Sequence, residues 1–438
     1  MKNVGDMDLD YLCTGCGGCE VICPTDAIKI KLKNDVYLPQ VDDNKCIKCN
    51  KCLLGCPGLS LNSKKYSDMI LKVEESTKED FMLGKFISNY LAYSTDKKLR
   101  FEAATGGLAT SILIYLFNEN IINGAVVTKM NEQDKTKSKT FVAQSIEEIR
   151  SAKTSKYCST HPLSTLKELK KTSKDKKFAF VGLPCHIHGL RKIQEQEKWV
   201  KDKIIFSIGI LCTHSVDYSG TRLILDKMAC GKENLIGIQY RGNGWPGSAA
   251  IEYKDKKISI PLENYWNPYF GPYFFTPYRC ISCNDLTAEL ADVSLGDALL
   301  KDIEENDDQG TSIVISRNNF VEKIIKKMAD KNLLSIEKIS KNIIKESQQN
   351  ILIRKKVTLA YRLSLFRFFS KAIPETEDKI SFSNDMISQK TKGYLGAFLI
   401  WFNSYLSKTK IGYNIIKLLP VNFLKKYSYY VNRIAGRK

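Results

Sequence analysis

The chain has 438 residues, of which 43% are hydrophobic and 26% charged, and its formal net charge is +19. This length predicts two or three domains that each bury a core, and the composition excludes a disordered chain. The first ten residues lack an apolar core segment. The longest apolar run near the end, 395–402, is far shorter than the ~20 residues of a membrane-spanning helix, so we expect a cytoplasmic protein.

Two cysteine runs with one spacing occur in the first sixty residues. Each run reads C-x2-C-x2-C-x3-C-P, and the eight cysteines are Cys13, Cys16, Cys19, Cys23, Cys46, Cys49, Cys52 and Cys56. Three closely spaced thiolates can surround three irons of a 4Fe-4S cube, and in two-cluster ferredoxins the fourth cysteine of each run serves the other cluster. We therefore group Cys56 with the first run and Cys23 with the second. A pair of zinc sites is the alternative, since zinc also binds thiolates. The spacing favours two 4Fe-4S clusters in a ferredoxin-like α+β domain over residues 1–62.

A polar segment, 63–90, is predicted to be a linker with a short helix, and a second domain begins after it. Thr105, Gly106 and Gly107 stand before a helical stretch, 108–117, with Thr105 as a reasonable N-cap. Glycines at a helix N-terminus make a natural anion site, where the phosphate of a cofactor could lie. A plain turn leading into a buried helix is the alternative.

A strand–helix–strand pattern follows in this domain. The segments 178–182 and 204–212 are mainly apolar, with a helical stretch between them, which predicts two parallel strands. Cys185 follows the first strand and Cys212 ends the second, so both lie at the carboxyl edge of the sheet, where open α/β sheets bind ligands.

A further C-x2-C pair is formed by Cys280 and Cys283. We expect a third 4Fe-4S cluster bound by Cys185, Cys212, Cys280 and Cys283. A redox-active dithiol pair and a zinc site are the alternatives. Cys158 and Cys230 have no partner spacing and are interpreted as ordinary buried thiols.

Two histidines stand beside these cysteines. His186 follows Cys185 directly, and His214 comes two residues after Cys212. An imidazole at a redox site could donate protons to a substrate or a flavin. These two residues are our candidate catalytic groups, and a hydrogen-bonding role near a helix end is the alternative.

The order of these motifs resembles a known family. ATGG before a helix, SKY, GLPCHIHGLR, the strand-ending Cys212, RCISC and DVSLGD resemble the beta subunits of coenzyme F-420 (deazaflavin) hydrogenases and dehydrogenases. The resemblance implies FAD and the additional 4Fe-4S cluster in an α/β domain with a mixed sheet, over residues 91–317. By position, it implies a flavin pocket formed by Thr105, Gly106, Gly107, Ser155, Lys156 and Tyr157.

The chain departs from the family pattern at three places. Leu183 stands where threonine is common, His186 where glutamine is common, and Ala298 follows Asp297 where an aromatic residue is usual. Related chains occur beside genes of bacterial sugar-polymer biosynthesis, so a polysaccharide biosynthesis context is one expectation and a deazaflavin substrate is not assumed. Because one fold serves many functions, the substrate has to be inferred from the residues of the site.

Residues 318–438 are expected to form a helical, basic C-terminal region. Residues 392–438 mix aromatic and aliphatic residues with nine Lys or Arg and contain no acid. Such a segment could lie on an anionic membrane, pack on the enzyme core, or contact a partner subunit. No nucleic-acid-binding module is recognised.

Together these features predict an iron–sulfur flavoprotein oxidoreductase. It would pass electrons between the clusters and FAD, with a redox protein as donor or acceptor and a small organic substrate. The alternative is a non-catalytic electron-relay subunit of a hydrogenase or dehydrogenase complex.

Overall fold

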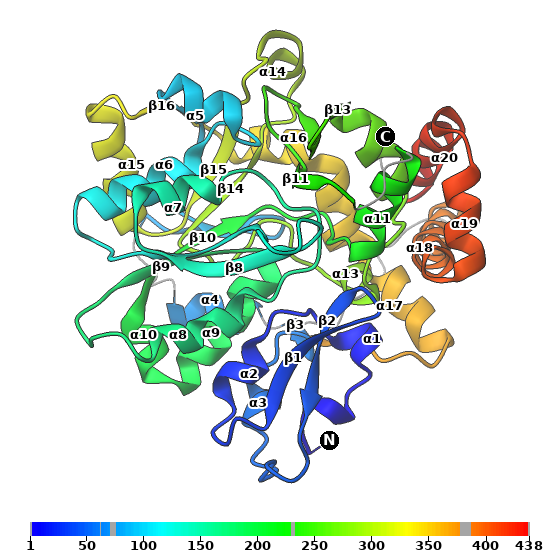
Figure 1. Cartoon of the computed structure of the whole chain (residues 1–438), viewed down its shortest axis with the longest axis horizontal. Coiled ribbons are helices and arrows are strands. Elements are labelled where there is room, and N and C mark those ends of the chain that lie inside the picture. The colour runs from blue at the N-terminus through cyan, green and yellow to red at the C-terminus, as the bar shows by residue number, and fades with distance from the viewer. Residues whose placement is uncertain (1, 62, 71–75, 229–232, 377–386, 437–438) are drawn as a thin grey trace.

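We analysed a computed structural model of the chain, which describes residues 2–61, 63–70, 76–228, 233–376 and 387–436 (Figure 1). A large sheet lies at the centre, the N-terminal module lies at one end of it, and the C-terminal helices flank one side.

The N-terminal module is built from short helices and one hairpin. Its elements are η1 (Val4–Asp6), α1 (Leu9–Leu12), α2 (Gly18–Ile22), β1 (Ile28–Lys33), β2 (Val36–Val41), α3 (Lys51–Leu54) and β3 (Ser60–Leu61). Strands β1 and β2 pair in antiparallel fashion around the turn at Asn34 and Asp35, which both have positive φ. The helices α2 and α3 each follow one of the cysteine loops.

The central sheet has eight strands and is mixed, as the sequence predicted. Its strands, in spatial order, are β16 (Leu334–Ile339), β6 (Ser88–Ser94), β15 (Ser312–Ser316), β14 (Val293–Asp297), β10 (Ile204–Ile210), β9 (Phe178–Gly182), β7 (Ala125–Met130) and β8 (Ser138–Ala143). Strands β7, β9, β10 and β14 are parallel to their neighbours within this group, and the outer strands are antiparallel.

Strand β9 shows why the sheet is covered on both faces. Ala179 packs in the core cluster on the side of α6 (Leu108–Asn118) and α15 (Asn319–Asp330). Phe178 and Phe180 point to the opposite cluster, beneath α9 (Pro184–Gln196). Since successive side chains of a strand alternate, a strand buried on both faces reads as a continuous apolar run.

Shorter elements surround this sheet. They are α4 (Ser63–Ile70), β4 (Lys78–Asp80), β5 (Gly84–Phe86), α5 (Lys97–Glu102), α7 (Ile146–Ser151), η2 (Pro162–Thr165), α8 (Leu166–Leu169), α10 (Lys198–Lys203), α11 (Tyr218–Lys227), β11 (Leu235–Gln239), β12 (Ser248–Tyr253), β13 (Lys257–Pro261), α12 (Leu262–Tyr265), η3 (Trp266–Phe270), α13 (Tyr278–Ile281) and α14 (Lys301–Asn306). Strands β11, β12 and β13 form a separate antiparallel sheet. Within the segment 63–90 that we predicted as a linker, α4 and the β4–β5 hairpin precede strand β6.

The C-terminal region is mainly helical, as predicted. It comprises α16 (Lys341–Leu352), the π-helical turn η4 (Ile353–Val357), α17 (Leu359–Phe368), β17 (Glu375–Thr376), α18 (Ile387–Lys408), α19 (Lys410–Leu418) and α20 (Val421–Ile434). Strand β17 pairs with β3, which ties this region to the N-terminal module.

Two local predictions were wrong. Within residues 318–438, which we expected to be helical and basic, strand β16 pairs with β6 along its whole length. Its apolar residues pair with the sheet and override the lysine-rich helical pattern. Thr105 is not the N-cap of α6, because Gly107 holds that position with φ of 70° and makes no side-chain cap.

Candidate iron–sulfur site

The eight N-terminal cysteines lie in two neighbouring parts of the module. Cys13, Cys16, Cys19 and Cys56 are close enough to influence one another electrostatically. Burial raises the pKa of all four thiols. Neighbouring thiols raise it further in Cys13, Cys16 and Cys19, and the pKa of Cys16 reaches about 11. The other four, Cys23, Cys46, Cys49 and Cys52, line one small cavity with about 300 Å³ of unfilled space, part of which is open to solvent.

The loop around Cys16 depends on glycine. Gly17 has φ of 84°, and a Cβ there would lie 2.3 Å from Oγ of Ser164. Gly15 also has positive φ, and its backbone N–H donates to Sγ of Cys13 at 3.3 Å. An N–H directed at a sulfur stabilises a ligating thiolate, so this loop has the backbone geometry that a cluster requires.

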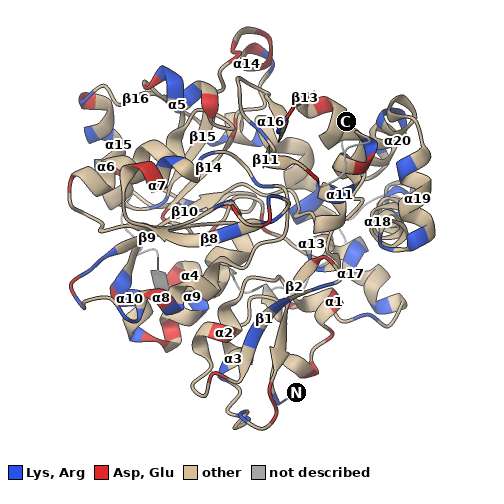
Figure 2. Ribbon diagram, viewed as in Figure 1, with Lys and Arg blue, Asp and Glu red and all other residues tan. Residues whose placement is uncertain are grey.

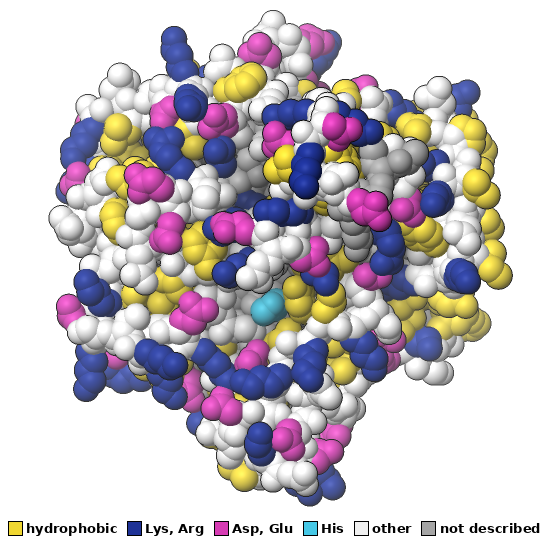
Figure 3. All heavy atoms as spheres, in the orientation of Figure 1, with side chains coloured by type: hydrophobic (Ala, Val, Ile, Leu, Met, Phe, Trp, Pro, Cys, Tyr) yellow, Lys and Arg dark blue, Asp and Glu magenta, His cyan; other side chains and the backbone are white. Residues whose placement is uncertain are grey.

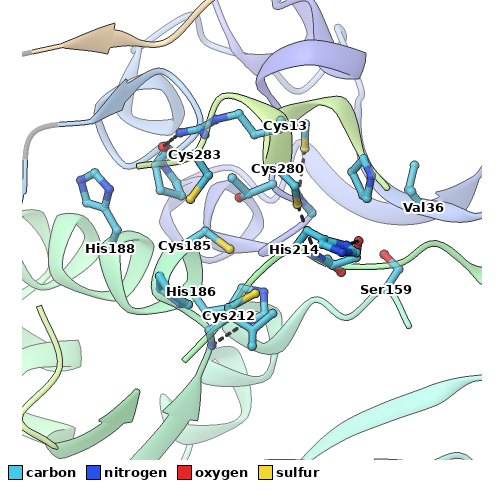
Figure 4. Close-up of a pocket in the computed structure, with 18 of the residues that line it drawn as sticks. Cys13, Val36, Ser159, Cys185, His186, His188, Cys212, His214, Cys280 and Cys283 are labelled. Carbon is cyan, nitrogen blue, oxygen red and sulfur yellow. Dashed lines mark hydrogen bonds between the residues drawn. The ribbon is translucent and has the colours of Figure 1, made fainter. Parts of the chain in front are cut away.

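Four cysteines distant in sequence meet at a second, larger cavity. The sulfur atoms of Cys185, Cys212, Cys280 and Cys283 lie around one space (Figure 4). This cavity contains about 1160 Å³ of unfilled space, part of which is open to solvent. Burial raises the pKa of Cys185, and the thiols of Cys280, Cys212 and Cys283 raise it further.

Secondary structure explains this convergence. Cys185 lies in the first turn of α9, just after β9, and Cys212 lies two residues after the parallel strand β10. Cys280 lies in the short helix α13 and Cys283 just beyond it. The backbone N–H of Ser215 donates to Sγ of Cys280 at 3.5 Å.

Cations lie beside these thiols. Burial alone would lower the pKa of Lys355 in η4, but the thiols of Cys283, Cys212 and Cys280 raise it above its usual value. Burial likewise opposes ionisation of Cys283, yet Lys355 and Arg279 lower the pKa of that thiol. Thiolate is the form that binds iron, so this environment suits a ligand set with net negative charge.

The two cysteine sites are contiguous. Cys13 of the N-terminal module lines the same large cavity as Cys280 and Cys283. Arg279 bridges them, because its guanidinium donates to the carbonyl oxygens of Gly58 at 3.1 Å and Pro57 at 3.2 Å. Our sequence analysis missed Arg279 and Lys355, although Arg279 directly precedes Cys280.

The two candidate catalytic histidines have different surroundings. His186 is buried in the first turn of α9, where its Nδ1 accepts a hydrogen bond from the N–H of Leu183 at 3.2 Å. Burial lowers the pKa of His186 to about 3. Its ring therefore caps α9 in the neutral form, as our alternative described. The ring of His214 lies between Trp266 and Tyr273, at centroid distances of 5.6 and 4.4 Å.

The residues of the predicted flavin pocket contact several elements of the domain. Thr105 and Gly106 lie against the start of β15, where the Thr105 hydroxyl donates to the Thr311 carbonyl at 3.1 Å. Tyr157 packs on Trp266 at a centroid distance of 4.5 Å and lies near the Arg241–Asp297 ion pair.

Lys156 is held by backbone carbonyl groups. Its ammonium donates to the carbonyl oxygens of Ala152, Lys153 and Thr154, at 2.6 to 2.9 Å, beyond the end of α7. Desolvation lowers the pKa of Lys156 to about 7. Lys156 therefore fixes the end of a helix, and Ser155 is a neighbour of the Tyr157 hydroxyl.

Among the described cysteines, Cys158 lines neither of the two cavities. Cys158 is buried, and burial raises its pKa to about 11. Cys230 lies outside the described residues. Within the described ranges, no three Cys, His, Asp or Glu side chains are placed to bind a single metal ion.

Three models of known protein families match this chain. Residues 12–59 match the model of a 4Fe-4S dicluster domain. Residues 89–167 match the N-terminal model of the beta subunit of coenzyme F420 hydrogenase/dehydrogenase, and residues 175–342 match its C-terminal model. The chain belongs to the coenzyme F420 hydrogenase/dehydrogenase beta-subunit family. The N-terminal domain of the chain is a 4Fe-4S dicluster domain, and the chain has a role in iron–sulfur electron transfer.

Curated relatives in this family have redox names. The chain is 27% identical to coenzyme F420 hydrogenase subunit beta of Methanothermobacter thermautotrophicus, covering 64% of this chain and 98% of that protein. It is 28% identical to coenzyme F420-dependent sulfite reductase of Methanocaldococcus jannaschii, over 75% of this chain and 48% of the relative. It is 26% identical to coenzyme F420 hydrogenase subunit beta of Methanococcus voltae, over 58% of this chain and 86% of that protein.

A solved structure shares the fold. A chain of the F420-reducing NiFe hydrogenase complex from Methanosarcina barkeri superposes with a TM-score of 0.54 at 22% identity, over 68% of this chain and 99% of that chain. The family models end at residue 342, so helices α17 to α20 and most of α16 lie outside them. Among the described helices, none combines the length and the apolar character needed to cross a membrane.

Proposed function

We propose that this chain is an electron-relay subunit of a larger oxidoreductase and binds three 4Fe-4S clusters. One observation carries the proposal: Cys13 of the dicluster domain lines the same cavity as Cys185, Cys212, Cys280 and Cys283. That arrangement supports a continuous electron path from the N-terminal domain into the family domain.

The proposed ligand sets follow the groups that we described. The three sets are Cys13, Cys16, Cys19 and Cys56; Cys23, Cys46, Cys49 and Cys52; and Cys185, Cys212, Cys280 and Cys283. The clusters, when bound, supply one-electron transfer. The protein contributes buried thiolates, directed N–H groups and the positive charges of Arg279 and Lys355, which raise the affinity for a negatively charged group.

The second set is the proposed point of exchange with a redox partner protein. Cys49 is exposed, and the exposed apolar side chains of Ile47 and Leu54 stand in the same part of the module. A small apolar contact around a cluster ligand would bring a partner's redox group close while keeping the encounter short. Relatives named as subunits of hydrogenase complexes support a protein partner.

A second candidate is a reductase that also binds FAD and acts on an organic substrate, with coenzyme F420 among the choices. The observation that favours it is the turn before α6. Gly106 and Gly107 both have positive φ and precede the N-terminus of α6, where backbone N–H groups can receive a phosphate. A Cβ on Gly106 would lie 2.6 Å from Oγ of Ser312, so packing against β15 also requires this glycine. Thr105, Gly106, Gly107, Ser155 and Tyr157 would then face the cofactor, while Lys156 would need to leave its carbonyl partners. His214 would remain the candidate proton donor.

Reductive titration distinguishes the two candidates. The anaerobically purified chain would be titrated with dithionite while its visible spectrum is recorded. A relay with three clusters accepts about three electrons per chain, whereas bound flavin adds about two more. An uptake of about two electrons, with no flavin absorbance, would leave the dicluster domain alone and contradict the three-cluster proposal.

A further inference from the structure

The C-terminal helices α18, α19 and α20 present a continuous apolar and basic outer face. Hydrophobic side chains gather along the edge of the molecule that these helices form (Figure 3). Many of the large exposed hydrophobic side chains of the described residues lie here. They are Tyr394, Leu395, Phe398, Phe402, Tyr405, Ile411, Ile415, Leu418, Phe423, Tyr429 and Tyr430.

Helical spacing places these side chains in stripes. On α18, Tyr394, Phe398, Phe402 and Tyr405 recur at intervals of three or four residues and so share one face. The rings of Phe398 and Phe402 stack at a centroid distance of 5.8 Å. On α19, Ile411, Ile415 and Leu418 also recur at intervals of four and three residues. Ile411 is 75% exposed and Leu418 is 81% exposed.

The opposite faces of the same helices are fixed to the protein. Ile400, Ile416 and Leu424 are each about 1% exposed and belong to the packed core. Asn403 donates to the carbonyl of Pro272 at 2.8 Å, and Lys227 donates to the carbonyl of Leu419 at 2.6 Å. Core packing therefore uses the inner faces only, and the apolar outer faces need another explanation.

Charge identifies the kind of partner. From residue 387 to the end the chain contains no Asp or Glu, while lysines stand along all three helices. Lys417 and Lys425 pair with acids of neighbouring elements, whereas Lys410 and Lys426 are exposed. Figure 2 shows these basic positions on α18 to α20. Lysine is depleted in protein–protein interfaces. Lysine beside exposed Phe, Tyr, Leu and Ile is typical of helices that lie in the headgroup region of an anionic membrane.

We propose that the outer face of α18–α20 docks the protein on an anionic lipid surface. The apolar stripes of α18 and α19 would enter the headgroup region, and lysines such as Lys410 and Lys426 would meet lipid phosphates. Such docking would hold the relay at a membrane without a spanning helix. It does not depend on how many clusters are bound.

Vesicle cosedimentation tests this proposal. The full chain, purified anaerobically, would be mixed with phosphatidylcholine vesicles with and without phosphatidylglycerol. We expect binding to the phosphatidylglycerol vesicles only, and weaker binding as salt is raised. The double variant Ile411→Glu/Leu418→Glu should lower the partition coefficient at least about tenfold, because two exposed apolar anchors are lost. Lys410→Glu/Lys426→Glu should lower it about tenfold.

A matched control carries the same chemical change elsewhere. Phe81, between β4 and β5, is 70% exposed, so Phe81→Glu should bind vesicles as the unmodified chain does. The proposal is overturned if the chain does not sediment with anionic vesicles, or if Ile411→Glu/Leu418→Glu binds them equally well. A dimer abolished by Ile411→Glu/Leu418→Glu, without vesicle binding, would assign this face to a second copy and also overturn it. The visible absorbance of each variant reports whether its clusters are intact. If the absorbance is unchanged, a loss of vesicle binding is a failure of docking and not of the relay.

Discussion

Arg279 donates to the carbonyl oxygens of Pro57 and Gly58 and thereby connects the loop of Cys280 to the loop of Cys56. The guanidinium is buried. It opposes the rise that burial causes in the pKa of Cys56, and together with Lys355 it lowers the pKa of Cys283. One side chain thus aligns two cysteine sites geometrically and supplies positive charge to both.

Two substitutions of Arg279 separate these effects. Arg279→Met removes the charge, so the reduction potentials of the two adjoining clusters should shift to more negative values, because a reduced cluster gains negative charge. Arg279→Lys keeps the charge but cannot donate to two carbonyls from a planar group. It should leave the potentials nearly unchanged and increase amide hydrogen exchange at residues 58–60, which follow Pro57 and have backbone N–H groups. Redox titration followed by electron paramagnetic resonance measures the first effect. Equal potentials in Arg279→Met and the unmodified chain would contradict it.

Lys355 should tune the third cluster alone. It lies beside Cys283, Cys212 and Cys280, and Lys355→Gln removes a buried positive charge from that site. The potential of the third cluster should become more negative, while the two clusters of the N-terminal domain keep theirs. The control is Lys341→Gln, since Lys341 is a half-exposed lysine that pairs with Asp80. A shift of the same size in the control would show that overall charge, rather than Lys355, sets the potential.

Serine variants test the exchange of fourth cysteines between the N-terminal clusters. Cys56 lies with Cys13, and Cys23 lies in the cavity lined by Cys46. Cys56→Ser should therefore perturb the same paramagnetic signal as Cys13→Ser, and Cys23→Ser the same signal as Cys46→Ser. The grouping is wrong if Cys56→Ser matches Cys46→Ser instead.

Asp217 should make the stability depend on pH. This carboxyl is buried at the N-cap of α11, where burial raises its pKa to about 7 from 3.8, against the opposing charge of Lys408. Between these values the folded state keeps a proton that the unfolded state releases, so stability falls as pH rises and the loss is complete above about pH 7.

The variant Asp217→Asn isolates this effect, because asparagine can accept the same hydrogen bond from the Ser219 amide but does not ionise. From about pH 5.5 to about pH 8 the unmodified chain should lose roughly 2 kcal/mol relative to Asp217→Asn. Anaerobic urea unfolding at both pH values measures this difference. A constant difference would mean that Asp217 ionises normally in the folded chain.

Prediction from the sequence was accurate where the spacing of residues along the chain determines the local structure. The C-x2-C-x2-C-x3-C-P runs indicated the dicluster domain, and apolar runs indicated the parallel pair β9 and β10 that brings Cys185 and Cys212 to one edge. Both signals are local, and few alternative structures satisfy them.

Features that depend on distant contacts could not be predicted. Lys355 reaches the cavity from the C-terminal region, some seventy residues beyond Cys283, and nothing in the sequence distinguishes it from a surface lysine. Strand β16 forms because β6 offers an open edge, a tertiary effect that outweighs the helical pattern. Lys156 caps a helix because α7 ends next to it.

Iron and sulfide content per chain after anaerobic purification tests the relay most directly. We predict about twelve irons and about twelve sulfides in the unmodified chain, and about eight of each in Cys280→Ser, because each 4Fe-4S cluster holds four of both. Cys158→Ser, a buried cysteine outside the three ligand sets, should retain about twelve. About eight irons in the unmodified chain, unchanged in Cys280→Ser, would contradict the third cluster and with it the continuous path through the protein.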